Sequence, residues 1–309
     1  MDMDFVLAPD DNYAQHAAAV VASILAHNSK HNVRIWILDG GLSELSKNIL
    51  SRSATPVEFL KIDAQTFENF PSNGYISVST WYRFSISKLL PASVGRVLYL
   101  DCDIAVAADV SELFETDLSN AALAAVKDCI WRKFDKRANL PRNYHYFNAG
   151  VLLLNLEYWR KHDVSGRLFD FANSSAENMK MMDQSILNVV LQREYKELPL
   201  KWNVQYMPPF LEESCYGFSE FAQAMSDPKI IHFVNKFKPW SARYGWLNPL
   251  NGFYLEHMGV RTEFTASKVS VFLGLFCKNF IRKPLFMARF DYWKNAAFFL
   301  KRLFWQKQN

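Results

Sequence analysis

The tripeptide Asp101-Cys102-Asp103 carries the sharpest chemical signal in the chain. It directly follows the apolar run of residues 96–100. Two carboxylates two residues apart can both turn toward one hard cation if the backbone bends between them. Such oxygen ligands suit magnesium or manganese, and the ion can bridge two phosphate oxygens of a nucleotide. Because a simple capped loop can have the same sequence, this hypothesis depends on further ligands elsewhere in the chain.

A histidine in a second apolar run offers a third ligand. His232 lies near the end of the segment Ile-Ile-His-Phe, and an imidazole there can complete the coordination sphere of the two carboxylates. Lys238 follows six residues later and supplies a cation for a phosphate group. The alternative is a hydrogen-bonded core histidine and a solvated lysine.

Polar residues also follow the first apolar run of the chain, residues 5–8. Asp10 and Asn12 offer hydrogen-bonding groups that suit a nucleobase and a ribose, and Tyr13 can stack on the base. The alternative role is capping of the helix that follows, which needs only one acid.

Two further positions combine charge with an apolar or helical context. Asp183 and Gln184 begin a predicted helix, where free backbone N–H groups favour a carboxylate; they either cap it or lie beside a sugar ring. Arg83 lies in a mostly apolar predicted helix, residues 81–90, so its charge needs a partner, for which the aspartates are candidates.

Strand-like and helix-like segments alternate through the first half of the chain. The predicted strands are residues 5–8, 33–38, 57–62, 96–100, 149–154 and 229–234. Apolar residues at spacings of three and four predict a helix around residues 17–25, and Ser43 begins another. This alternation predicts an α/β fold with three layers and a parallel sheet, whose ligand lies beyond the carboxyl ends of the strands.

Composition limits the class of protein. The chain has 309 residues, of which 50% are hydrophobic and 21% charged. A sizeable core in one large or two modest domains is expected, and disordered and collagen-like chains are excluded. The four cysteines form no CxxC pair, which favours a reducing cytoplasm. We find no secretory signal and no apolar run long enough to span a membrane.

The charge is distributed unevenly. From Lys268 onward there are nine Lys or Arg and one acid, whereas residues 1–267 hold 26 basic and 30 acidic groups. Many Phe residues are interleaved with these cations, which is typical of helices that lie on an anionic membrane surface. A nucleic-acid partner is the alternative, but no RRM, KH or helix-turn-helix signature is present.

Five segments in order resemble family 8 of the retaining glycosyltransferases. They are FVLAPDDNY, RVLYLDCDIAV, HYFNAGVLLLNLEYWR, MDQSILN and IHFVNKFKPW, and the resemblance covers residues 3–241. The chain is similar in particular to bacterial lipopolysaccharide and lipooligosaccharide galactosyl- and glucosyltransferases. The resemblance implies a GT-A fold, which is a Rossmann-like fold of three layers, together with a UDP-hexose donor and Mn²⁺, with Mg²⁺ as a possible substitute.

The resemblance also implies a role for each matching residue. The implied metal ligands are Asp101, Asp103 and His232. The implied uridine, ribose and phosphate contacts are Ala8, Asp10, Asn12, Tyr13, the backbone of Cys102, Asn235 and Lys238. The implied sugar contacts are Arg83, Asn148, Ala149, Asp183 and Gln184, with Asp128 near the sugar or acceptor. Asp128, Asp183 and Gln184 would be catalytic, with Gln184 nearest the reactive face of the anomeric carbon.

Two residues depart from the family pattern. Many relatives have a second acid where this chain has Ser185, so one candidate nucleophile is missing and front-face substitution is favoured. Asn235 replaces a frequent glycine of the phosphate loop, although asparagine also tolerates left-handed backbone geometry.

The whole chain is therefore predicted to have a catalytic GT-A domain, residues 1–263, and a basic aromatic tail, residues 264–309. The tail would hold the enzyme on the inner face of the cytoplasmic membrane, where a saccharide acceptor, predicted to be lipid-linked, is assembled, and no nucleic acid is involved. The alternative is a non-catalytic UDP-sugar-binding relative that acts in a glycan assembly complex.

Overall fold

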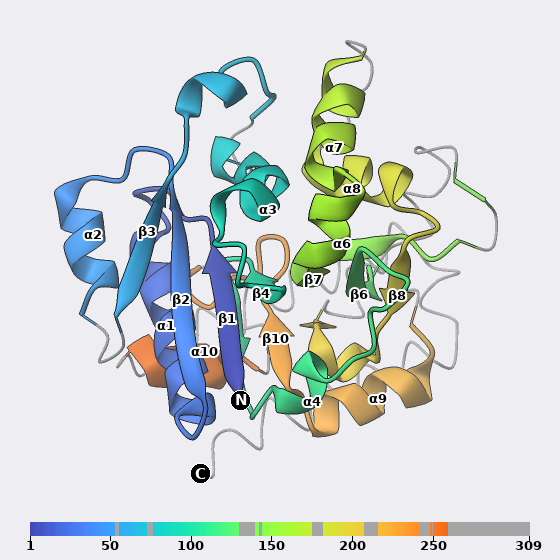
Figure 1. Ribbon diagram of the computed structural model, residues 1–309. Coiled ribbons are helices and arrows are strands. Elements are labelled where there is room, and N and C mark those ends of the chain that lie inside the picture. Colours follow the sequence, from blue (N-terminus) through green and yellow to red (C-terminus); the bar gives the residue numbers. More distant parts are fainter. Residues whose placement is uncertain are drawn as a thin grey trace, which may run out of the picture.

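A seven-stranded sheet forms the centre of the protein, shown in a computed structural model (Figure 1). The structure describes residues 1–52, 56–72, 77–129, 140–141, 144–174, 182–206, 216–241, 248 and 250–258. The strand order is β3-β2-β1-β4-β7-β6-β8. The strands are β1 (Asp2–Leu7), β2 (Asn32–Asp39), β3 (Val57–Lys61), β4 (Arg96–Leu100), β6 (Leu123–Lys127), β7 (Phe147–Asn155) and β8 (Tyr195–Glu197). All six strands predicted from the sequence are present, with small shifts at their ends.

The sheet is mixed, which corrects the prediction of a parallel sheet. Strand β7 runs antiparallel to both β4 and β6, whereas β1 is parallel to β2 and β4. An entirely apolar strand is typical of burial on both faces, and burial alone does not determine direction. The reversal places the start of β7 beside the carboxyl end of β4.

A second, three-stranded sheet packs against the first. It has the order β5-β10-β9 and consists of β5 (Ile104–Val106), β10 (Ile230–His232) and β9 (Val204–Gln205). Strand β10 is antiparallel to β5 and parallel to β9. Because β5 follows β4 after only three residues, this small sheet lies at the carboxyl end of the main one.

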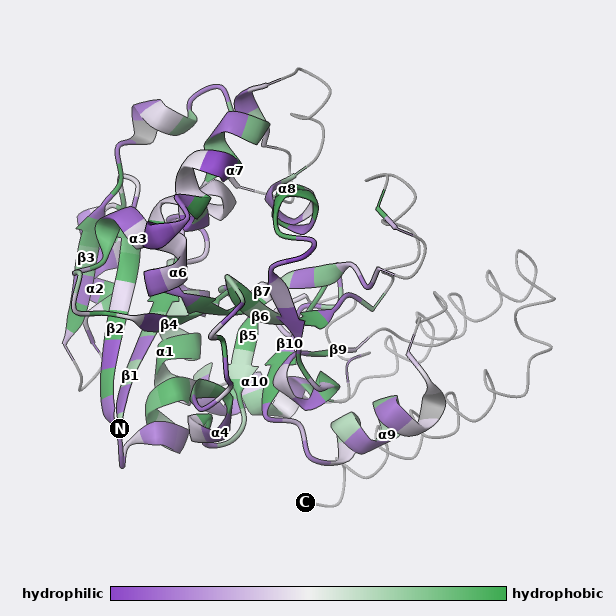
Figure 2. Ribbon diagram, turned by 45° about the vertical axis from the view of Figure 1, so that its right-hand side comes forward, coloured by the Kyte–Doolittle hydropathy of each residue, from purple (hydrophilic) through white to green (hydrophobic). Residues whose placement is uncertain are grey.

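Helices cover both faces of the main sheet. They are α1 (Ala14–Asn28), α2 (Glu44–Leu50), α3 (Ile86–Leu89), α4 (Ser111–Phe114), α6 (Leu156–Lys161), α7 (Val164–Asn173), α8 (Asp183–Val190), α9 (Phe218–Ser226) and α10 (Asn251–Met258). Within the described ranges, 3₁₀ helices form at Ala64–Phe67, Val78–Ser85 and Leu200–Trp202. Figure 2 shows hydrophobic residues concentrated on the central strands, whereas the outer helices α7 and α9 mix both kinds of residue.

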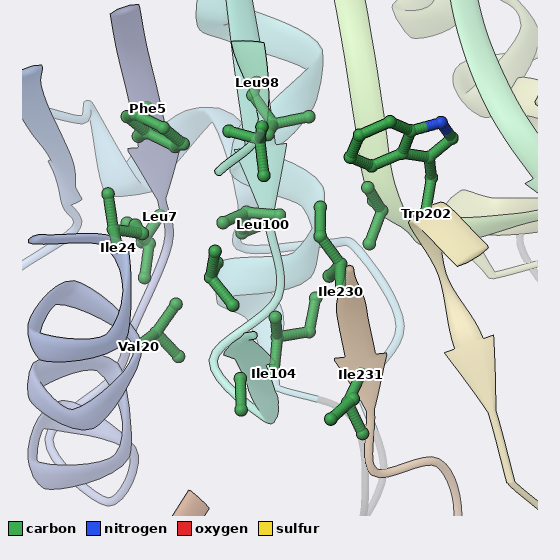
Figure 3. Packing of buried hydrophobic residues seen from close by; sticks show 14 of the residues in the cluster. Phe5, Leu7, Val20, Ile24, Leu98, Leu100, Ile104, Trp202, Ile230 and Ile231 are labelled. Atoms are coloured by element: carbon green, nitrogen blue, oxygen red, sulfur yellow. The ribbon is translucent and has the colours of Figure 1, made fainter. Parts of the chain in front are cut away.

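Alternate residues of each strand enter two separate cores. Phe5 and Leu7 of β1 pack with α1 and the small sheet, and Figure 3 shows them beside Val20 and Ile24. Val6, between them, faces the opposite core, which holds α3, α6, α7 and α8. This alternation is the two-residue period of a strand that is buried on both faces.

Local sequence explains two of the helix starts. Ser43 caps α2 as predicted, because its hydroxyl accepts a hydrogen bond from the Ser46 N–H. Asp10 accepts a hydrogen bond from the Tyr13 N–H just ahead of α1, at 3.0 Å. The single helix predicted over residues 81–90 is instead the 3₁₀ helix Val78–Ser85 followed by α3. The tighter 3₁₀ geometry buries Trp81, Arg83 and Phe84 together.

Within the described residues, no helix is both long enough and apolar enough to cross a membrane. The predicted tail of residues 264–309 lies outside the described residues.

Candidate active site

Two short strands bring the predicted metal ligands together. Asp101 follows β4, Asp103 precedes β5 and His232 ends β10. The antiparallel pairing of β5 with β10 sets His232 opposite Ile104, and the Phe233 N–H donates to the Asp103 carbonyl at 2.9 Å. Backbone hydrogen bonds therefore hold two segments, 129 residues apart in the sequence, in one register.

The three side chains form a compact acidic cluster. One ligand atom from each of Asp101, Asp103 and His232 lies within 4.8 Å of the others. His232 Nε2 is 3.1 Å from Asp103 Oδ1 and 3.9 Å from Asp101 Oδ2. Two carboxylates and an imidazole form a donor set that suits manganese or a similar divalent cation.

Two observations test whether these residues fit a cation. Asp103 Oδ1 is buried and has no hydrogen-bond partner among the described residues, as expected of an oxygen intended for a metal ion. Gly150 has no side chain at the place that the acidic cluster fills: a Cβ there would lie 2.2 Å from His232 Cε1 and 2.9 Å from Asp101 Oδ2. The residues fit a divalent cation.

Lys238 lies directly beside this cluster. Its ammonium group contacts Asp103 Oδ2. Burial raises the pKa of Asp103, but its interactions with neighbouring groups, above all the charge of Lys238, outweigh burial and hold that pKa well below its usual range. The loop that carries Lys238 turns at Asn235, which has a φ of 59°, so the asparagine adopts the left-handed geometry expected at this position. A fixed cation is therefore available to any phosphate that binds here.

Arg83 links the acidic cluster to α8. Its guanidinium lies 2.9 Å from Asp101 Oδ1 and 3.2 Å from Asp183 Oδ2, and it donates to the Ala149 carbonyl at 2.6 Å. The Tyr99 ring lies 4.4 Å below it. Burial lowers the pKa of Arg83, but the negative partners outweigh burial and raise it. The prediction that this arginine needs an aspartate partner is confirmed.

Gln184 is held at both ends of its amide. Its Oε1 accepts from the Ala149 N–H at 3.0 Å, and its Nε2 donates to Asp128 Oδ2 at 3.2 Å. Asp128 also accepts from Asn148 Nδ2 at 3.0 Å. A backbone donor on one side and a carboxylate on the other fix which end is oxygen, so the amide has one orientation.

The side chain of Ser185 contacts that of Tyr146. Its Oγ lies 2.7 Å from the Tyr146 hydroxyl. Because the next residue along a helix points about 100° away, Ser185 cannot take the place of Gln184.

The polar residues after β1 lie at the same edge of the sheet. Burial, Asp101 and Asp103 raise the pKa of Cys102, and a hydrogen bond to the Ala8 backbone joins the ends of β4 and β1. Asp10 is partly buried, while Asn12 is exposed. Tyr13 lies edge-on to the Trp240 ring at 6.1 Å, and burial raises the pKa of Tyr13 to about 12. The predicted nucleoside contacts therefore adjoin the metal cluster.

Sequence reasoning missed Gly150 and Asn203. A glycine inside an apolar strand often marks a close approach of another group, so Gly150 carried a usable signal. Asn203 Oδ1 lies 3.2 Å from His232 Nδ1. It follows a 3₁₀ helix in a segment without any motif, and only the packing of β9 beside β10 reveals it.

Known proteins match the chain over most of its length. The model of glycosyl transferase family 8 matches residues 4–243. General stress protein A of Bacillus subtilis (strain 168) is 30% identical over 251 residues, which cover 78% of this chain and 88% of that protein. A lipopolysaccharide 1,2-glucosyltransferase of Escherichia coli is 28% identical over 260 residues, which cover 81% of this chain and 75% of that protein.

A solved structure matches the fold. The galactosyltransferase LgtC, crystallised in complex with donor and acceptor sugar analogs, superposes with a TM-score of 0.73 at 25% identity and covers 87% of this chain and 100% of that one. The fold is therefore GT-A, as the sequence resemblance implied, and the protein is a glycosyltransferase. Since the family model spans well over half of its length, the chain belongs to glycosyl transferase family 8.

Proposed function

We propose that this protein is a retaining hexosyltransferase that moves galactose or glucose from a UDP-sugar to a saccharide acceptor, with manganese as its ion. The observation that carries the proposal is the continuity of the site. Asp101 belongs to the cation cluster and also pairs with Arg83, which in turn pairs with Asp183 next to Gln184. A diphosphate at the cluster would thus be adjacent to groups that can hold its sugar.

The residues have separate tasks in this reaction. Asp101, Asp103 and His232 would hold the manganese ion, which when bound supplies positive charge to the leaving diphosphate. Lys238 adds a second cation for the same charge. Gln184 presents a fixed amide dipole to the electron-poor anomeric carbon and forms no stable ester with it.

Retention is proposed from the family resemblance, and Ser185 in place of a second acid favours front-face substitution over a protein nucleophile. The bond from the anomeric carbon to the diphosphate breaks, and the acceptor oxygen bonds to the carbon on the same face. The departing diphosphate oxygen takes the acceptor proton, so no protein nucleophile is consumed. The product would keep the α configuration of the donor.

The acceptor is proposed to be a growing lipopolysaccharide, lipooligosaccharide or related surface glycan. The support is similarity to the Escherichia coli lipopolysaccharide 1,2-glucosyltransferase. Residues 264–309, with their excess of cations, would hold the enzyme peripherally on the inner face of the cytoplasmic membrane, next to a lipid-linked acceptor.

The decisive experiment measures UDP release from a panel of UDP-sugars, with manganese and with EDTA. Activity with one UDP-hexose and an α-linked product by NMR are expected. Asp103→Ala should lower turnover about 100- to 1000-fold while the circular dichroism spectrum is unchanged. Asp227→Ala is the control, because the Asp227 side chain is exposed and pairs with Lys229 away from the cluster. EDTA rates within about twofold of the manganese rates, or a β-linked product, would contradict the proposal.

A further inference from the structure

A chain of four buried polar side chains begins at His232 of the acidic cluster and leads away from it. His232 Nδ1 lies 3.2 Å from Asn203 Oδ1, and Asn203 Nδ2 donates to Asn148 Oδ1 at 3.0 Å. Asn148 Nδ2 then donates to Asp128 Oδ2 at 3.0 Å. All four residues are at most 6% exposed. Because no water competes at these atoms, each must find its partner within the protein.

Backbone geometry fixes the direction of this chain. The Gly150 N–H donates to Asn148 Oδ1 at 2.9 Å, so that atom is an oxygen. Asn203 must therefore turn its NH₂ group toward Asn148, which leaves its Oδ1 facing His232. Since Oδ1 only accepts, His232 must carry its proton on Nδ1.

The opposite tautomer conflicts with the same contacts. With the proton on Nε2, the unprotonated Nδ1 would require the Asn203 amide to rotate by half a turn. Asn203 Oδ1 would then face Asn148 Oδ1, and two buried acceptors would lie together without a proton. Asn203 therefore admits only one tautomer of His232.

We propose that Asn203 is a positioning residue that holds His232 as the Nδ1–H tautomer and directs the Nε2 lone pair at the cation cluster. The position of Asp103 supports this. Its Oδ1 lies 3.1 Å from His232 Nε2, so one cation can be bound by both atoms. The use of this tautomer for metal binding rests on the proposed function.

The first test reads the tautomer directly in the metal-free, full-length protein. Two-bond ¹H–¹⁵N correlation spectra of histidine-labelled protein distinguish the two ring nitrogens, and the signal missing in His232→Gln identifies the residue. His232 should be protonated on Nδ1 and unprotonated on Nε2. A wild-type His232 with its proton on Nε2 would overturn the proposal without any variant of Asn203.

The second test removes the hydrogen-bond acceptor of His232, which is Asn203 Oδ1. Asn203→Ala removes Oδ1, so the Nε2–H form should appear and the Mn²⁺ affinity measured by electron paramagnetic resonance should fall about 10- to 100-fold. Asn203→Asp still accepts from Nδ1–H and should keep the wild-type tautomer, but its second oxygen would face Asn148 Oδ1, so this variant should also be less stable. Asn203→Ala with an unchanged tautomer and affinity would refute the assignment.

Asn28→Ala is the control for simple loss of stability. Asn28 is also fully buried, and its amide makes two backbone hydrogen bonds, to the Ile24 carbonyl and from the Val110 N–H. This variant should be less stable but keep the His232 tautomer and the Mn²⁺ affinity. If wild-type protein has the Nδ1–H tautomer but does not bind Mn²⁺, the metal of the proposed function fails while the tautomer assignment stands.

Discussion

Single residues in this site are held by contacts on more than one side. The Gln184 amide lies between the Ala149 N–H and the Asp128 carboxylate, so it would need no reorientation in the proposed reaction. Such preorganised dipoles contribute most where charge develops in a transition state. Ser185, one residue along the helix, contacts the Tyr146 hydroxyl through its Oγ at 2.7 Å. The two neighbours should therefore respond differently to truncation.

Gln184→Ala should lower kcat about 100-fold or more, because the fixed dipole and the Asp128 contact are both lost. Ser185→Ala should keep activity within about threefold, since a single neutral hydrogen bond is removed away from the reacting carbon. Steady-state kinetics with the preferred UDP-sugar compare the two. Equal losses would mean that the reactive face lies elsewhere.

Gly150→Ala should damage the cation cluster while the strand remains intact. The added Cβ would lie 2.2 Å from His232 Cε1 and 2.9 Å from Asp101 Oδ2, so both side chains must move. We expect at least about a 10-fold weaker Mn²⁺ affinity by electron paramagnetic resonance. Gly217→Ala is the matched control, because a Cβ there meets nothing within 4 Å. Unchanged Mn²⁺ affinity in Gly150→Ala would argue against this position of the ion.

Three elements meet at His16 of α1. Its ring stacks on Trp240 at 3.8 Å, and its Nδ1 lies 2.5 Å from the hydroxyl of Tyr254 in α10. Trp240 belongs to the loop that also carries Lys238. The contacts of His16 with Trp240 and Tyr254 therefore fix the loop that carries Lys238 against α1 and α10. Burial lowers the pKa of His16 to about 4.

The stability of this junction should depend on pH with a defined sign. The unfolded chain binds a proton at His16 near pH 6.5, whereas the folded protein binds it only near pH 4. Stability is fully present above pH 6.5 and is lost as the pH falls toward 4, with about 2 kcal/mol gone by about pH 5. Urea unfolding at a series of pH values compares wild type with His16→Gln. The difference in their free energies of unfolding should change over this window, and a constant difference would contradict the assignment.

The whole molecule combines a mildly acidic body with a strongly basic end. Residues 1–267 hold more acids than bases, whereas nine cations and one acid follow. Each cation near an anionic surface contributes about 1 kcal/mol, so even half of the excess gives appreciable affinity that salt weakens. The proposed membrane binding would therefore depend on residues 264–309 rather than on the catalytic fold.

A protein truncated after Glu263 should remain folded, be more soluble and still use small soluble acceptors. The full-length protein should float with anionic vesicles at low salt, and the truncated one should not. Neutral phosphatidylcholine vesicles and high salt are the controls. If the truncated protein floats equally well, or the full chain ignores anionic vesicles, residues 264–309 are not the anchor.

Much of the fold was predictable because local pattern determines it. Apolar runs of four to six residues identified six strands, whereas β5, β6, β8 and β9 were not predicted, and Ser43 identified the start of α2. The prediction that β7 runs parallel to its neighbours was wrong, because the sequence of an apolar strand does not indicate which strands it pairs with or in which direction. The 3₁₀ helix Val78–Ser85 was predicted as α-helix, because periodicity over eight residues does not separate the two forms.

The sequence by itself determined which chemical groups are present and at which strand ends they occur. Asp101, Asp103 and His232 were identifiable because each adjoins or ends a buried run. Only the tertiary structure decided how they meet. The reversal of β7 brings Asn148 and Gly150 to the carboxyl end of β4, and the small sheet sets His232 against Asp103. The tautomer that Asn203 assigns to His232 depends on these long-range backbone contacts, which no local pattern encodes.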